Sequence, residues 1–170
     1  MLQMSYAWSF PSHQTFKMKP VRDFIELHME GDVILDPFAN RRVFDGVITN
    51  DINPNSEVDY HMDALDFLKM FDDGSVDFLF FDPPYSLRQL KECYDGIGRA
   101  LTHRESKRFF SDLKDEIQRV MKPKGKVMSF GWSSVGMSAA RGFTKEALLL
   151  VCHGGIHQDT IVLLETFYTG

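Results

Sequence analysis

The chain has 170 residues, of which 44% are hydrophobic and 25% are charged, a balance typical of one globular domain with a sizeable core. Its net charge of −5 at pH 7 excludes a protein that coats nucleic acid nonspecifically, because Lys and Arg neutralise the phosphates in such binding. Any contact with nucleic acid must therefore come from local basic patches. No stretch is apolar and long enough to span a bilayer, and the N-terminus lacks a leader pattern. We expect a single cytoplasmic domain over residues 1–170, without a separate target-recognition domain.

Hydrophobic spacing divides the chain into alternating helices and strands. Residues 20–30 have the helical period, with Pro20 suited to the first helical position. The clearest strand is 76–81, which is almost continuously apolar, as expected of a strand buried on both faces. Other predicted elements are strands at 33–35, 46–52 and 126–130, a weak strand at 58–62, helices at 64–71 and through 110–120, and a C-terminal antiparallel hairpin of 147–152 and 160–167. Together these elements predict an α/β fold with a doubly wound, seven-stranded, mostly parallel sheet that ends in the antiparallel hairpin.

Acidic or proline-bearing sequences follow four of the predicted elements. In an open α/β sheet, ligands bind beyond the carboxyl ends of the strands. Residues 36–40 (DPFAN) follow the first strand, Asp51 the second, Asp63 the weak third and residues 82–85 (DPPY) the fourth. All four sequences are therefore expected to border one crevice.

The DPPY sequence suits chemistry on an exocyclic amine. The lone pair of such an amine is delocalised into the ring. A catalyst must therefore favour pyramidal geometry at the nitrogen, by accepting hydrogen bonds from its N–H groups. Asp82 and the carbonyl of Pro83 are two candidate acceptors, Pro84 keeps the backbone extended, and Tyr85 offers a stacking face. A base in a duplex would have to be flipped out, at a cost of roughly a few kcal/mol. The alternative is a turn that only terminates the strand.

Two acidic residues have structural alternatives. Asp51 lies where nucleotide-binding α/β folds place an acid that accepts hydrogen bonds from ribose hydroxyls. Taken alone, however, an Asx turn before Asn53-Pro54 is the simpler explanation of a single Asp in such a loop. Asp63 is a candidate for contact with a cofactor adenine and, equally, an N-cap for the helix that begins at Ala64.

Together these residues resemble the S-adenosylmethionine-dependent amino-methyltransferases of the DNA adenine type, specifically small phage-associated enzymes. The resemblance covers about residues 15–165 and implies a Rossmann-like class I methyltransferase fold, S-adenosylmethionine as cofactor and a flipped adenine of DNA as substrate, in a bacterial or phage-infected cell. It implies that residues 1–19 form a flap and cofactor segment. The implied catalytic residues are Asp82, Pro83, Pro84 and Tyr85, and the implied cofactor residues are Phe16, Lys19, Asp36, Pro37, Phe38, Ala39, Asp51, Ile52, Asp63 and Ala64.

The sequence departs from this family pattern in its first motif. The usual glycine-rich turn after DPF is replaced by Asn40-Arg41-Arg42, so the methionine end of the cofactor is expected to be held differently. Arg41 or Arg42 is a candidate partner for the cofactor carboxylate, although solvation of adjacent surface arginines is the simpler interpretation. With no room for a recognition domain, target choice falls to short loops or a partner subunit, or specificity is low. A partner subunit or a homodimer is a candidate assembly.

Several other signals favour structural roles. His153 and His157 flank a glycine turn, but without further clustered ligands no metal site is expected. Cys93 and Cys152 lack the spacing of a disulfide framework or a zinc site. Methylation of RNA or of a protein amide, and a noncatalytic methyltransferase-like subunit, remain alternatives to DNA methylation.

Overall fold

The computed structural model describes residues 1–12, 14–84, 86–155 and 157–168, without the side chains of residues 87 and 103–105. Its sheet has seven strands in the order β1-β6-β7-β5-β4-β2-β3, and only β7 runs against the others. The strands are β1 (Gln3–Trp8), β2 (Ile34–Asp36), β3 (Val47–Thr49), β4 (Val76–Phe81), β5 (Met121–Gly131), β6 (Phe143–Cys152) and β7 (Thr160–Phe167). The predicted mostly parallel sheet with a C-terminal antiparallel hairpin is confirmed.

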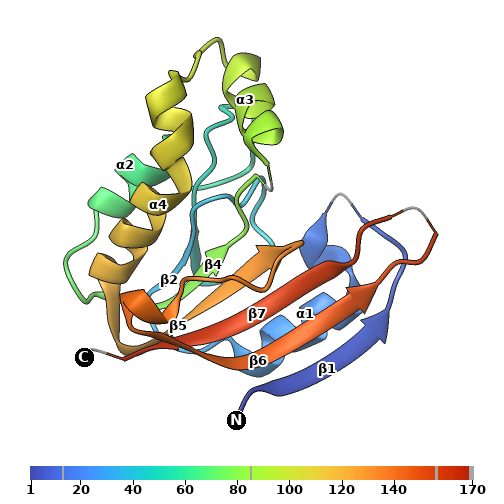
Figure 1. The fold of residues 1–170 in the computed structure, drawn as a ribbon. Helices are drawn as coiled ribbons and strands as arrows, with labels where there is room; N and C mark the ends of the chain where they lie inside the picture. The colour runs from blue at the N-terminus through green and yellow to red at the C-terminus, as the bar shows by residue number, and fades with distance from the viewer. Residues whose placement is uncertain (13, 85, 156, 169–170) are drawn as a thin grey trace.

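Helices cover the two faces of the sheet unequally, as Figure 1 shows. Helix α1 (Lys19–His28) packs on one face, and α2 (Ala64–Lys69) and α4 (His103–Val120) pack on the other, over the half that contains β4. Helix α3 (Leu87–Gly96) stands beside α4 above the end of β4. Two short 3-10 helices are η1 (Thr15–Lys17) and η2 (Ala139–Arg141). None of the helices in the described ranges is long and apolar enough to cross a membrane.

Each face of the sheet has its own apolar core. One core joins α1 to the sheet through Val21, Ile25 and Phe80, and the other joins α4 to it through Leu113 and Ile117. The alternation of side chains along a strand sends successive residues of β4 to opposite cores. This explains why residues 76–81 are almost continuously apolar.

Two strand predictions differ from the structure. Residues 58–62 do not form a strand, because Asp59 bonds Thr49 with its side chain and the backbone contributes only an isolated bridge between Tyr60 and Asn50. The seventh strand is instead β1, whose side chains are mostly exposed and give no buried alternation to detect. The count of seven strands was correct although one of its members was wrong.

Candidate functional site

A cavity of about 1050 Å³ lies at the carboxyl ends of β2, β3 and β4. Of the residues predicted to hold a cofactor, Pro37, Phe38, Asp51, Ile52 and Ala64 line it. Asp82, Pro83 and Pro84 line it from the end of β4. The reversed direction of β7 brings the β6–β7 loop to the same edge, where His153, His157 and Thr160 complete the wall. The structure thus brings most of the predicted residues to one cavity.

The DPPY sequence forms the connection between β4 and α3. Strand β4 ends at Phe81, and Ser86 caps α3 by accepting a hydrogen bond from the backbone N–H of Gln89 at 3.2 Å. Asp82 is half-buried, Pro83 is buried and Pro84 is half-buried at the cavity wall. Tyr85 lies outside the described residues. A buried strand on one side and a capped helix on the other therefore fix both ends of this connection.

Asp36 lies buried at the end of β2 and does not line the cavity. Its carboxylate accepts a hydrogen bond from the backbone N–H of Phe38 at 3.1 Å. Burial raises the pKa of Asp36 well above its ordinary value, against the effect of that hydrogen bond, and the nearby carboxylates of Asp82 and Asp51 raise it further. Burial and the neighbouring carboxylates therefore favour the neutral form of Asp36.

The raised pKa of Asp36 predicts a pH-dependent stability. An acid whose pKa is higher in the folded state than in the unfolded chain takes up protons on folding, so its contribution is present below about pH 3.9 and is lost as pH rises through the raised pKa. We expect the Asp36→Asn variant to lose less stability than the wild type between pH 5 and pH 8. Denaturant unfolding at both pH values measures this, and equal losses in the two proteins would contradict it.

Asp51 forms the predicted Asx turn and also faces the cavity. Its Oδ1 accepts from the backbone N–H of Asn53 at 2.7 Å, and its Oδ2 accepts from that of Asn40 at 3.0 Å. A carboxylate oxygen can accept more than one hydrogen bond. The turn therefore orients Asp51 without using all its capacity to accept bonds from a ligand.

Asp63 is the N-cap of α2 and also anchors α3. Its Oδ1 accepts from the backbone N–H of Leu65 at 2.9 Å, which confirms the predicted cap. Its Oδ2 accepts from the hydroxyl of Tyr94 and from Arg99 at 3.3 Å. Burial and the Asp63 carboxylate raise the pKa of Tyr94, so the phenol remains a donor. Asp63 thereby holds the α3 wall of the cavity in place.

Asn50 is a buried residue of the site that the sequence analysis missed. Its side-chain amide donates to the carbonyl oxygens of Pro37 at 3.1 Å and Met62 at 3.0 Å, and its Oδ1 accepts from the backbone N–H of Met62 at 3.1 Å. One side chain therefore joins the three segments that follow β2, follow β3 and precede α2. The only signal in the sequence was a polar residue at the end of an apolar run.

Residues from the expected N-terminal cofactor motif lie in different places. Phe16 packs in the core against Phe80 and Phe130, and it borders a small second cavity of about 70 Å³ together with Ala39. Lys19 lines neither cavity. It is exposed at the start of α1, where its ammonium pairs with Asp23 at 2.6 Å. Lys19 and Asp23 are i, i+4 neighbours on the same helix face, and the contact of Lys19 with a cofactor stays a prediction.

Asn40 replaces glycine in the turn after DPF. It adopts a φ of +53°, in the left-handed region that Asn tolerates better than most residues. Arg42 pairs with Asp59 across the neighbouring loop, whereas Arg41 borders the small cavity. The tight turn is therefore kept without the glycines, and Arg42 has a partner within the protein.

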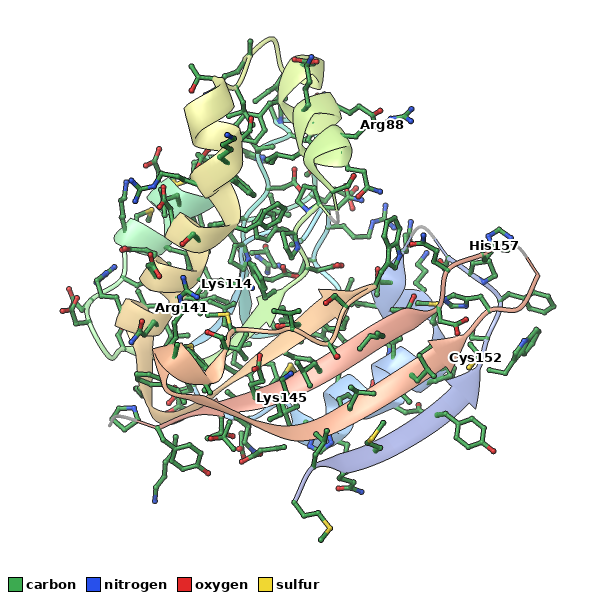
Figure 2. The ribbon with its side chains drawn as sticks, in the orientation of Figure 1. Arg88, Lys114, Arg141, Lys145, Cys152 and His157 are labelled. Atoms are coloured by element: carbon green, nitrogen blue, oxygen red, sulfur yellow. The ribbon has the colours of Figure 1, made fainter. Side chains whose placement is uncertain are left out.

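The N-terminal segment reaches the cavity after leaving β1. The carbonyl of Ser9 accepts from Nδ1 of His153 at 2.8 Å, so Nε2 of that ring is left to accept from the hydroxyl of Thr160 at 2.8 Å. Pro11 and Ser12 then line the cavity opposite α3. The expected flap over residues 1–19 thus begins as a strand and is tied to the β6–β7 loop. Figure 2 shows His157 in that loop and Arg88 projecting outward from α3.

The protein-family models and the curated proteins that were searched contain no match to the sequence. Solved structures do match the fold. TrmN from Thermus thermophilus superposes with a TM-score of 0.58 at 15% identity, over 88% of this chain and 49% of that one. The 1,6-didemethyltoxoflavin-N1-methyltransferase of Burkholderia thailandensis, solved with its substrate and S-adenosylhomocysteine, gives 0.59 at 11% identity over 89% and 78%. A SAM-dependent methyltransferase of Methanosarcina mazei gives 0.54 at 11% identity over 86% and 98%.

This chain spans about half the length of the TrmN chain and nearly all of the Methanosarcina one. Identities this low show the shared fold alone. The mostly parallel seven-stranded sheet, with β7 reversed between β6 and β5, agrees with that fold. The chain therefore has the Rossmann-like fold seen in S-adenosylmethionine-dependent methyltransferases.

Proposed function

We propose that this protein transfers a methyl group from S-adenosylmethionine to the exocyclic amino group of adenine in DNA. The observation that carries the proposal is the position of Asp82 and Pro83 at the end of β4, in the wall of the same cavity that Asp51, Ile52 and Ala64 line. The candidate hydrogen-bond acceptors for the amine and the candidate residues for the cofactor therefore line the same cavity, as methyl transfer to a base requires.

The cavity fits S-adenosylmethionine by its chemistry. Phe38, Ile52 and Ala64 offer apolar surface to an adenine ring, and Asp51 offers a carboxylate to ribose hydroxyls. When bound, S-adenosylmethionine supplies an electrophilic methyl group. The carboxylate of Asp82 and the carbonyl of Pro83 would accept hydrogen bonds from the N–H groups of the target amine and so orient its lone pair.

The distribution of charge supports a nucleic acid as the partner. Residues 87–108 contain six Lys and Arg against three Asp and Glu, whereas the rest of the chain contains 13 against 21. The net charge is thus +3 in this segment and −8 elsewhere. The segment forms α3 and the start of α4, and residues of α3 line the cavity. Arg88, Arg99 and Arg108 have carboxylate partners. The local excess of Lys and Arg supports attraction of phosphates despite the acidic total.

The direct test is methyl transfer to defined acceptors. The protein is incubated with radiolabelled S-adenosylmethionine and unmethylated DNA at low salt, where phosphate contacts are strongest, and the DNA is digested to nucleosides. We expect the label in methyladenine. Parallel reactions with RNA and with protein extract cover the other acceptors. Label only in one of those would move the activity to that substrate, and no label anywhere despite bound cofactor would contradict an enzymatic role.

Asp51 provides a test of the cofactor site. The Asp51→Asn variant keeps an oxygen for the Asx turn but removes the negative charge, and a hydrogen bond to a charged group is worth about 1.5–3 kcal/mol. We expect its Kd for S-adenosylmethionine in calorimetry to rise about tenfold or more. Asp66→Asn, an exposed position on α2, is the matched control. An unchanged Kd would leave Asp51 with a role in the turn alone.

A further inference from the structure

Strand β1 is an edge strand with an unusually apolar surface. It pairs with β6 over all six residues from Gln3 to Trp8, and Figure 1 shows no element beyond it. Met4, Tyr6 and Trp8 are 70%, 83% and 59% exposed. Because side chains alternate along a strand, these three share the face opposite α1, whereas Ala7 packs toward the α1 core.

The edge lacks the features that normally prevent strand pairing. Exposed edges are usually protected by charged side chains, proline or a bulge. Residues 3–8 contain no charge and no proline, and their register with β6 is regular. No Asp, Glu, Lys or Arg occurs anywhere in residues 1–16.

We propose that β1 is a dimerisation edge, which pairs antiparallel with β1 of a second copy of this chain. Antiparallel pairing of identical strands generates the two-fold symmetry that most homodimers have. A register centred on Tyr6 sets Tyr6 of one copy opposite Tyr6 of the other and Met4 opposite Trp8. Cross-strand pairs of aromatic and large apolar side chains stabilise sheets. The two sheets then become one continuous sheet.

Charge favours a second copy over a nucleic acid at this edge. Two chains of net charge −5 repel each other. The electrostatic repulsion between them is smallest when they meet through surfaces without charged side chains. Aromatic side chains also stack on bases, but such sites carry Lys or Arg for the phosphates. Residues 1–16 have none.

The exposed area is of the size that a dimer needs. Tyr6, Trp8 and Phe10 are 83%, 59% and 75% exposed. With about 150–250 Å² for each side chain, these three expose roughly 300–500 Å². A standard interface buries about 800 Å² per partner. The aromatic side chains therefore offer about half of that area, and Met4 and the backbone along the paired strands add to it.

The first test is the oligomeric state by light scattering. We expect the wild type to be a dimer and Tyr6→Lys to lose the dimer, because two lysines would meet at the axis. Tyr6 is 83% exposed, so the Tyr6→Lys variant should still fold and unfold cooperatively, with only the stabilisation that comes from association lost. Leu27→Lys, 76% exposed on α1, is the matched control and should remain dimeric. A monomeric wild type, or a Tyr6→Lys variant that stays dimeric, would overturn the proposal.

Cross-linking tests the register. In a background with Cys93→Ser and Cys152→Ser, oxidised Tyr6→Cys should form a disulfide-linked dimer, whereas Leu27→Cys should not. A monomeric wild type that loses oligonucleotide binding on Tyr6→Ala would assign the strand to nucleic acid and overturn the proposal. Dimer formation does not depend on methyl transfer, so either proposal can fail alone.

Discussion

The Asp82→Ala variant is expected to lose methyl transfer while it keeps its fold and its affinity for S-adenosylmethionine. Asp82 lies at the end of β4 in the cavity wall, half-buried rather than in either core. Removing one preorganised polar group that acts on the reacting atoms typically costs about a hundredfold to a thousandfold in kcat. We therefore expect kcat to fall by at least about a hundredfold.

The measurement is the initial rate of label transfer to DNA at saturating cofactor, with calorimetry on the same samples. Asp66→Ala, which removes an exposed carboxylate from α2, should retain the wild-type rate. If Asp82→Ala kept the wild-type rate, another group would have to accept the hydrogen bonds from the amine. If the variant lost cofactor affinity instead of kcat, Asp82 would belong to the cofactor site.

The Asn50→Ala variant is expected to destabilise the whole protein and to disorganise the cavity. The substitution leaves three backbone groups without their side-chain partner: the buried carbonyl oxygen of Pro37 and the partly buried carbonyl oxygen and N–H of Met62. Each unsatisfied buried group costs about 1–3 kcal/mol. We expect a loss of roughly 3–5 kcal/mol in the free energy of unfolding, since water can satisfy part of the deficit.

Denaturant unfolding measures this loss, and cofactor calorimetry on the folded fraction measures its effect on the cavity. The exposed carboxylate of Asp66 again supplies the control variant. A loss below about 1 kcal/mol, the usual effect of a single mutation, would mean that the three segments are held together without Asn50.

The elements of the fold that could be predicted from the sequence are those with an apolar period. The residues at 76–81 and 160–167 were assigned with the bounds that the structure has, because both strands are buried and bounded by Pro or polar loops. Strand β1 could not be predicted, because an exposed edge strand has no buried face to mark it. Conversely, residues 58–62 have strand-like composition, but Asp59 uses its carboxylate to bond Thr49 instead.

For the candidate site, the order of motifs predicted which residues meet but not how they are held. Asp51 and Asp82 both reach the cavity because the carboxyl ends of parallel strands share one edge. The use of Asp63 to anchor Tyr94 depends on how α3 packs, which involves residues 31 positions apart. The ion pair of Lys19 with Asp23 was likewise not predicted, because the position of Lys19 in its motif says nothing about a partner on the same helix.

The pairing of β1 with β6 also constrains how the protein matures during synthesis. Gln3 lies opposite Ala147, so the first strand has no partner until 144 further residues have been made. At about 5–20 residues per second, the delay is roughly 7–30 s. Throughout that time an uncharged, aromatic-rich segment is free to meet other nascent chains. The side of the cavity formed by Pro11 and Ser12 must therefore be completed last, when the C-terminal hairpin has left the ribosome.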